Sequence, residues 1–533
     1  GLRTLTVSRE KDQWGEEFCF INNGVKIFAM GANYIPEDQI VTRCNEVKTR
    51  KLLADCKAAN YNFIRVWGGG YYPDEYFYDY CDENGIIVWQ DFMFACSVYK
   101  ADRDFCENVM NEVADNVIRL RNHPSLGLWC GNNEIESAWE YWGLPEDEEA
   151  KRDYLIIFED IIPQVLKAYD PCENTFYWPS SPSSGGGFKD ASSNHAGDMH
   201  YWDVWHNFKP IEAFREFYYR FCSEYGFESL PDIKTCRAFA DETKGDFDLC
   251  SPVMAAHQKC VQGNEKIMYY LAQMVRYPYD FKQLIYSSQL VQADCIRSNV
   301  EHMRRARGRC MGSAYWQVND SNPVISWSSI DYFGRWKGLH YYAKRFYAPC
   351  LISCDDTHRK KPVLNISNER MTAFEGIVRW KLRNNKAEIL QSGEKSVNVP
   401  ALTAQNVLTI DLSDELKNRT DPREKYLEYS IMENGKVLSF GTTLFVRPKE
   451  FTFLEPAITY GISESEDKFA LTFCAENYAK SVCLSLKTAD CVFSDNWFDI
   501  HGKEPVTIMI DKASLSRKMT AQELSEELEI MHN

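Results

Sequence analysis

Long apolar runs are absent from this sequence of 533 residues, since no stretch reaches the about 18 consecutive apolar residues of a membrane-spanning helix. An excess of positive charge is absent as well: 60 Lys and Arg against 77 Asp and Glu leave a formal net charge of −17. A nucleic acid or an anionic membrane surface requires a basic face, so neither is expected as a partner. The hydrophobic share of 44% and the charged share of 26% are typical of a globular protein.

Disulfide and metal patterns are also missing. The 19 cysteines lack the regular spacing of a disulfide framework, and neither a Cys-x-x-Cys pair nor a Cys/His zinc spacing occurs. We therefore expect no metal ion and no other cofactor, and a reducing compartment, the cytoplasm, is favoured. No secretory leader is recognisable and the first residue is Gly1 rather than methionine, so the natural chain is expected to begin earlier.

Strand and helix patterns alternate over residues 26–350 and predict a (β/α)8 TIM barrel. Apolar residues at helical spacing occur between the strands, at 46–60, 104–121 and 154–169. The eight strand candidates are residues 26–34, 63–67, 86–92, 126–131, 175–180, 199–202, 221–224 and 313–318. A barrel of this kind carries its active site at the C-terminal ends of the strands.

Beyond residue 350 the pattern changes to short alternating segments without good helices between them. Together with the hairpin signal Asn434-Gly435, they predict an immunoglobulin-like β-sandwich over residues 351–450 and a second, smaller one over residues 451–533. Residues 1–25 are expected to contain the end of a preceding β-sandwich domain and a strand that leads into the barrel.

Two glutamates follow directly on predicted buried strands. Glu134 comes after the fourth strand and Glu224 ends the seventh. A carboxylate at such a strand end is poorly placed for packing and well placed for chemistry. Two carboxylates from distant parts of one chain are what cleavage of a glycosidic bond requires. In a closed barrel the two strand ends can face each other across the mouth.

Seven motifs follow one another along the predicted barrel: Gly31-Ala-Asn-Tyr-Ile-Pro, Arg65-Val-Trp-Gly-Gly-Gly-Tyr-Tyr, Val88-Trp-Gln-Asp-Phe-Met-Phe-Ala, His123-Pro-Ser through Glu134, His200-Tyr-Trp, Ser223-Glu-Tyr-Gly-Phe and Tyr315-Trp-Gln-Val-Asn-Asp. These motifs resemble family 2 glycoside hydrolases, and within them the β-mannosidases. The β-galactosidases and β-glucuronidases of that family carry a Ser-His-Tyr-Pro type segment where this chain has Trp67-Gly-Gly-Gly.

The resemblance implies a retaining exo-glycosidase that releases terminal β-D-mannosyl residues from oligosaccharides or glycans by double displacement. Glu224 would be the nucleophile and Glu134 the acid/base. Arg65 matches the arginine that keeps the nucleophile ionised, although a structural ion pair is the alternative. Asn133 matches the asparagine that binds the sugar 2-hydroxyl.

Aromatic side chains are expected to line the sugar site, because a flat apolar ring matches the C–H face of a pyranose. The resemblance assigns Trp67 and Trp316 to the walls of the site, Trp142 to the leaving-group side, and Trp202 to the site with less support. His200 either reaches a sugar hydroxyl or has a structural role. For Trp139 and Trp205 a place in the core is expected.

Other readings stay open. The same scaffold would suit an exo-β-glucosaminidase or an endo-β-mannosidase. The resemblance implies two β-sandwich domains ahead of the barrel, and residues 1–25 are expected to hold only the end of the second. The alternative is a carbohydrate-binding fragment that is inactive without its N-terminal domains, and those domains are then expected as a partner besides the glycan.

Overall fold

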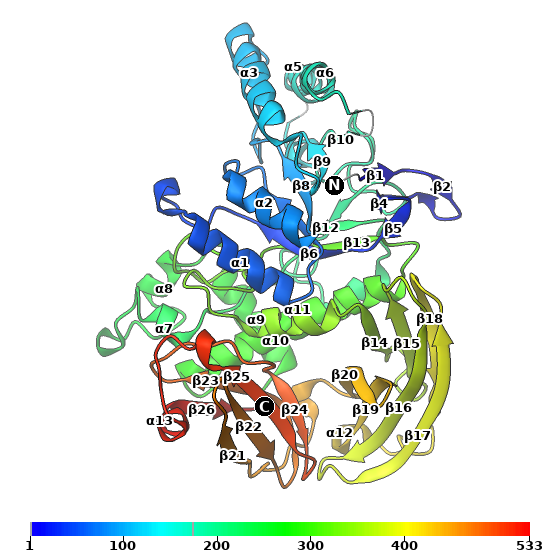
Figure 1. The fold of residues 1–533 in the computed structure, drawn as a ribbon, viewed down its shortest axis with the longest axis vertical. Helices are drawn as coiled ribbons and strands as arrows, with labels where there is room; N and C mark the ends of the chain where they lie inside the picture. The colour runs from blue at the N-terminus through cyan, green and yellow to red at the C-terminus, as the bar shows by residue number, and fades with distance from the viewer. Residues whose placement is uncertain (1–2, 146, 173–174) are drawn as a thin grey trace. The chain divides into compact units, whose positions relative to one another are not determined.

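The computed structural model describes residues 3–145, 147–172 and 175–533. The chain forms two compact units, Gly1–Phe227 with Ser298–Asn322, and Glu228–Arg297 with Pro323–Asn533 (Figure 1). Gly1 and Leu2, which belong to the expected end of a preceding domain, lie outside the described residues. No helix in the described ranges is both long and apolar enough to cross a membrane.

An eight-stranded parallel sheet organises the first unit. Its strands lie in the order β10-β9-β8-β7-β6-β13-β12-β11, and the sheet is curled as in a TIM barrel (Figure 1). The strands are β6 (Ala29–Tyr34), β7 (Phe63–Val66), β8 (Ile87–Asp91), β9 (Leu126–Cys130), β10 (Tyr177–Trp178), β11 (Met199–His200), β12 (Cys222–Glu224) and β13 (Gly312–Tyr315). Each of the eight predicted strands is present, and the predicted fold class is confirmed.

The two edge strands of this sheet are linked by the buried carboxylate of Asp198, which directly precedes β11. Trp178 Nε1, from β10, donates to Asp198 Oδ1 at 2.7 Å. Ser181 Oγ, three residues further along the chain, donates to Oδ2 at 2.7 Å. Because a buried carboxylate needs such donors, this residue ties the fifth strand to the sixth.

Helices follow most of the strands. In α3 (Arg103–Leu120) the apolar residues at helical spacing, Val109, Val113, Val117 and Leu120, are the buried ones. The patterns at 46–60, 104–121 and 154–169 are thereby confirmed as helical. The other helices of the first unit are α1 (Glu46–Ala58), α2 (Glu75–Asn84), α4 (Ile135–Tyr141), α5 (Glu148–Tyr154), a π-helical segment (Leu155–Ile161) and α6 (Ile162–Tyr169).

Aromatic residues fill the N-terminal end of the parallel sheet. The strands β1 (Leu5–Ser8), β4 (Cys19–Asn22) and β5 (Val25–Ile27) form a small antiparallel sheet, and β2 (Lys11–Asp12) pairs with β3 (Gly15–Glu16). Phe18 and Phe20 of this segment pack against Phe63, Trp89 and Phe221 of the strands. The apolar core thus occupies one end of the sheet interior, and polar side chains collect at the other.

The second unit contains helices and two β-sandwiches. Its helices are α7 (Ile233–Cys236), α8 (Pro252–Ala256), α9 (Gly263–Met274), α11 (Gly338–Phe346), α12 (Asp421–Glu424) and α13 (Ala521–Glu527), while α10 (Phe281–Arg305) begins in this unit and ends in the first. The first sandwich consists of β14 (Cys350–Asp355), β15 (Val363–Asn368), β16 (Phe374–Asn384), β17 (Ile389–Val399), β18 (Thr403–Thr409), β19 (Lys425–Glu433) and β20 (Lys436–Leu444). It packs the sheet β14-β15-β18 against the sheet β17-β16-β19-β20 around a core that includes Phe374 and Leu427. The predicted hairpin is present, with Asn434 and Gly435 at positive φ.

The strands of the second sandwich are β21 (Thr459–Glu464), β22 (Lys468–Cys474), β23 (Tyr478–Leu486), β24 (Phe498–His501), β25 (Val506–Asp511) and β26 (Leu528–Met531). They form the sheets β21-β22-β25 and β24-β23-β26. Both sandwiches agree with the predicted class, whereas the predicted boundaries at residues 350 and 450 stay predictions.

Candidate active site

Glu134 lies where β9 gives way to helix α4, in a left-handed backbone conformation with φ 60° and ψ 11°. This conformation is uncommon for a residue with a side chain and costs on the order of 1–2 kcal/mol. The backbone around Glu134 holds it there, since its N–H donates to Ser181 O at 2.8 Å and the N–H of Asn133 donates to Phe94 O at 2.9 Å. Strained backbone at a strand end is a frequent property of functional residues.

Glu224 ends strand β12, and its side chain is 6% exposed. Besides His200, two donors reach its carboxylate: Arg65 Nη1 at 3.3 Å from Oε1 and Trp202 Nε1 at 3.1 Å from Oε2. Burial alone would raise the pKa of Glu224, but the charges of His200 and Arg65 outweigh burial and lower it. Glu224 is therefore held as a carboxylate.

His200, at the end of β11, lies between the two glutamates. Its Nδ1 is 2.7 Å from Glu134 Oε1 and 3.2 Å from Glu224 Oε2, and the ring is 3% exposed. Carboxylate oxygens of Glu134 and Glu224 lie within 4.8 Å of each other at this point. Burial alone would lower the pKa of His200, but the charge of Glu224 and the hydrogen bond to Glu134 raise it to about 9.

Arg65 connects the polar ends of several strands. Its guanidinium is fully buried and donates to Asp91 Oδ2 at 2.8 Å, to Asn33 Oδ1 at 2.9 Å and to Asn133 Oδ1 at 2.7 Å, as well as to Glu224. Asn133 is thus turned with its oxygen toward Arg65, and its Nδ2 lies 3.3 Å from Cys96 Sγ. A single arginine positions the nucleophile candidate and the asparagine predicted to bind the sugar.

The predicted tryptophans occupy different environments. Trp67 and Trp316 form an edge-to-face pair with ring centroids 5.0 Å apart, and both are half-buried. A Cβ at Gly69 would lie 1.8 Å from the ring of Trp67, so this glycine leaves the space that the ring occupies. Trp142 is 49% exposed, whereas Trp205, expected in the core, is fully buried.

Four residues of this site were not assigned a role from the sequence: Asn33, Asp91, Ser181 and Asp198. A usable signal existed for Asn33 and Asp91, because both are polar residues near the end of a buried strand, as Glu134 and Glu224 are. For Ser181 and Asp198 the sequence offered none. Both lie outside the named strands, and only the fold brings Ser181 into contact with His200 and Asp198 into contact with Ser181.

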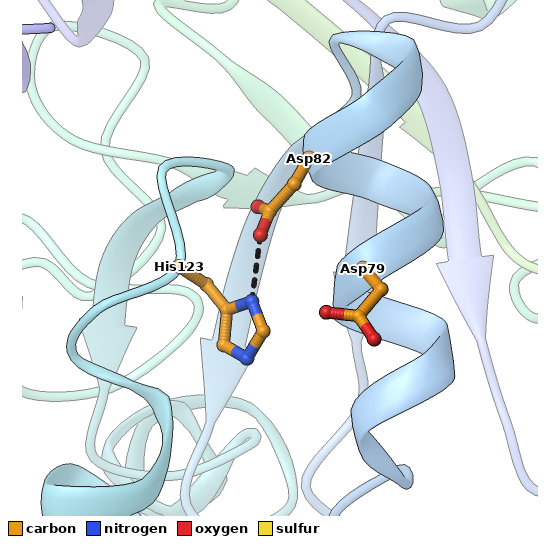
Figure 2. Close-up of side chains that lie close together, drawn as sticks. All are labelled: Asp79, Asp82 and His123. Atoms are coloured by element: carbon orange, nitrogen blue, oxygen red, sulfur yellow. Dashed lines mark hydrogen bonds and ion pairs between the residues drawn. The ribbon is translucent and has the colours of Figure 1, made fainter. Parts of the chain in front are cut away.

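A second cluster of carboxylates and a histidine lies in the same unit (Figure 2). Asp79 and Asp82 project from α2 toward His123, which precedes β9. His123 Nδ1 is 2.7 Å from Asp82 and Nε2 is 3.1 Å from Glu75, so both ring nitrogens already meet carboxylates. We interpret this cluster as an ion-paired clamp between α2 and the start of β9.

Known proteins resemble the chain in sequence and in structure. Beta-mannosidase B of Aspergillus clavatus is 32% identical over 531 residues, which cover 94% of this chain and 62% of that protein. The Beta-mannosidase of Bos taurus is 35% identical over 382 residues, covering 66% of this chain and 42% of that protein. The crystal structure of Beta-D-Mannosidase from Dictyoglomus thermophilum superimposes with a TM-score of 0.92 at 30% identity, covering 100% of this chain and 63% of that one.

Family models match the C-terminal part of the chain. A Mannosidase Ig/CBM-like domain matches residues 361–450, and an Ig-fold domain matches residues 453–533. The chain spans less than two thirds of the length of the curated relatives it matches, 62% in the case of the Aspergillus clavatus protein.

A curled parallel sheet whose C-terminal end gathers two glutamates, a histidine and an arginine, in a chain with these relatives, places the protein in the glycoside-hydrolase-like class. The particular group follows from the mannosidase domains and the sequence identities. The chain belongs to the β-mannosidase-like proteins of glycoside hydrolase family 2, as the sequence motifs indicated.

Proposed function

We propose that this chain is the catalytic part of a retaining, exo-acting β-mannosidase. One observation carries the proposal: Glu134 and Glu224 meet at the C-terminal end of one sheet, with carboxylate oxygens within 4.8 Å of each other. Retaining glycosidases hold their carboxyl groups about 5–5.5 Å apart, whereas inverting enzymes separate them by about 6.5–9.5 Å to admit a water molecule. The short separation supports double displacement.

In this mechanism Glu224 attacks the anomeric carbon and forms a glycosyl ester, while Glu134 protonates the departing oxygen. Water then attacks the same carbon, Glu134 accepts its proton, and Glu224 leaves as a carboxylate. Arg65 and Trp202 would stabilise the charge of Glu224 before attack and after its release, since both donate to its oxygens. Asn133 would contact the 2-hydroxyl, and Trp67 with Trp316 would border the mannosyl ring.

A panel of 4-nitrophenyl β-glycosides (manno, gluco, galacto and glucosamino) tests the substrate, using both this chain and the longer protein. The proposal expects the mannoside to be cleaved fastest, with Glu224→Ala at least about 10⁴-fold slower. Proton NMR during the reaction should show β-mannose first, and α-mannose first would exclude retention. Preference for the glucosaminide would identify an exo-β-glucosaminidase instead, and binding of mannose without turnover would indicate a binding fragment.

The proposed mechanism uses side chains alone, so the rate should survive dialysis against EDTA. We also propose a reducing compartment for the protein. All 19 cysteines lie in the described part of the chain, and none forms a disulfide. Thiol titration of the denatured protein should give the same count with and without prior reduction, and a lower count without reduction would contradict this.

A further inference from the structure

The hydroxyl group of Ser181 determines the protonation of one nitrogen of His200. Asp198 accepts hydrogen bonds from four donors: Trp178 Nε1, the N–H of Ser183, Ser181 Oγ and Ser223 Oγ. Four donors occupy the lone pairs of an ionised carboxylate, so Asp198 acts only as an acceptor. The single hydroxyl hydrogen of Ser181 is therefore used toward Asp198. His200 Nε2, 3.0 Å from the same oxygen, must carry a hydrogen and donate it to Ser181.

The other nitrogen of His200 faces the two glutamates. Nδ1 is within hydrogen-bonding distance of both, at 2.7 Å from Glu134 and 3.2 Å from Glu224. A bare lone pair on Nδ1 beside carboxylate oxygens would be repulsive, so a hydrogen must lie among these three atoms. A hydrogen on Nδ1 satisfies both carboxylates, whereas a hydrogen on Glu134 would leave Glu224 facing the lone pair.

We propose that His200 is a positioning residue that stores the proton of the reaction. In the free protein His200 is an imidazolium whose Nδ1 hydrogen is shared by Glu134 and Glu224, and this proton reaches the leaving group through Glu134. The role of this proton in catalysis rests on the proposed function, whereas the protonation state of His200 is argued from the geometry alone. The raised pKa of His200, about 9, has the direction that this geometry requires.

The proton and charge balance is consistent through both steps. Before attack, the imidazolium and two carboxylates have a combined charge of −1. In the first step Glu224 becomes a neutral ester and the bond from the anomeric carbon to the aglycone breaks. The Nδ1 proton of His200 passes to the carboxylate of Glu134 and from there to the departing oxygen, so Glu134 ends the step ionised. Neutral His200, ionised Glu134 and the ester again sum to −1. In the second step water gives its proton back by the same route as Glu224 leaves.

A constant charge is favourable in this setting, because charging a buried site without compensation is costly. The remaining charged and titratable groups around the ring are few among the described residues. Arg65 and Asp91 lie on the side of Glu224, Asp198 lies behind Ser181, and the thiol of Cys96 is 3.8 Å from Glu134 Oε2. Burial and the carboxylates raise the pKa of Cys96 to about 12, so this thiol does not supply the proton at neutral pH.

The protonation state can be measured without an activity assay. Protein labelled with ¹⁵N-histidine should give one imidazole that has hydrogens on both nitrogens at pH 7 and loses the Nδ1 hydrogen only above about pH 8. Glu134→Gln removes one carboxylate charge and keeps the shape of the side chain. This variant identifies the signal of His200, because it should lower the pKa of that imidazole. A neutral ring at pH 7, or a ring with bare Nε2, would overturn the proposal.

The catalytic part is tested with His200→Asn, since an asparagine amide can donate a hydrogen bond toward Glu134 but cannot release a proton near neutral pH. With a poor leaving group, such as methyl β-mannoside, the alkaline limb of kcat/KM should move down by one pH unit or more. The leaving group of 2,4-dinitrophenyl β-mannoside needs no proton. On this substrate the variant's loss of kcat/KM should be at least about 10-fold smaller than its loss on methyl β-mannoside. An unmoved alkaline limb, or equal losses on both substrates, would contradict the storage role.

The two proposals fail in different ways. If no β-mannoside is cleaved by the longer wild-type protein, the proposed function is wrong, whatever the ¹⁵N spectra show. If mannosides are cleaved but His200 is neutral, the function stands and the proton store is wrong. His200→Gln is the matched control, because its amide reaches toward Ser181 rather than Glu134. Its alkaline limb of kcat/KM should stay below that of the wild type, as in His200→Asn.

Discussion

Arg65 Nη1 lies 3.3 Å from Glu224 Oε1, and the fully buried guanidinium of Arg65 also forms a 2.8 Å ion pair with Asp91. Removing this arginine leaves the buried carboxylate of Asp91 without its cation and leaves Glu224 with His200 as its cation. Breaking a buried ion pair in this way costs about 3–5 kcal/mol, and losing one electrostatic contact at a reacting group costs about 10²–10³ in kcat. Arg65→Met should therefore lose both stability and activity, measured by urea unfolding and by aryl mannoside hydrolysis.

Arg119→Met is the control for that prediction. Arg119 pairs with Glu75 at 2.9 Å, but both side chains are substantially exposed. Exposed ion pairs contribute about 0–1 kcal/mol, so this variant should unfold close to the wild type and keep its activity. Equal losses in both arginine variants would mean that burial of the Arg65 pair is not what matters.

Trp202 offers a sharper test, because its ring and its N–H can be separated. Trp202→Phe keeps an aromatic ring and removes the donor that lies 3.1 Å from Glu224 Oε2. A hydrogen bond to a charged group is worth about 1.5–3 kcal/mol, so kcat/KM should fall by about 10- to 150-fold. Steady-state kinetics on an aryl mannoside measure this, and a fall confined to KM would argue for ring contact instead.

Trp142 predicts the opposite pattern. Nearly half of this residue is exposed, and it lies at the C-terminal end of α4, beyond Glu134. If it contacts the leaving-group side, Trp142→Ala should leave hydrolysis of an aryl mannoside within about 3-fold and should raise KM for mannotriose, since uniform binding affects KM alone. A large fall in kcat on the aryl substrate would place Trp142 closer to the reacting atoms than predicted.

The sequence was sufficient for the fold because each strand pattern is local. Apolar runs such as 126–131 predict their own strands, and eight of them with helices between allow few arrangements. Glu134 and Glu224 were found for the same reason, since each ends such a run. That the two strand ends face each other was expected from a closed barrel and from the family resemblance, whereas the side chains that lie between the two carboxylates depend on the fold.

His200 illustrates that limit. Its motif suggested contact with a sugar hydroxyl or a structural role, and neither expectation included the position of its Nδ1 between two carboxylates. The supporting chain through Ser181 and Asp198 joins residues from two loops, and no periodicity marks such residues. Hydrogen positions in the site follow from this chain, so they could be argued only after the fold was known.

His123 makes the stability of the first unit depend on pH. Its hydrogen bond to Asp82, opposed by burial and reinforced by Glu75, raises the pKa of His123. A histidine whose pKa is raised on folding stabilises the fold fully below its unfolded pKa of about 6.5, and the stabilisation is lost as pH rises through the folded pKa. Burial alone would raise the pKa of Asp82 and of Glu75, but their hydrogen bonds lower both, so their contribution is lost as pH falls.

The clamp should therefore be strongest between about pH 5 and pH 6.5. His123→Gln should lower the urea midpoint of the first unit more at pH 6 than at pH 9, by an amount equivalent to about 1 kcal/mol or less, because the pair with Glu75 is half-exposed. Asp82→Asn should likewise lower the urea midpoint more at pH 6 than at pH 9. If the variant and the wild type differ equally at both pH values, His123 contributes through packing alone, and its protonation has no part in holding α2 to the start of β9.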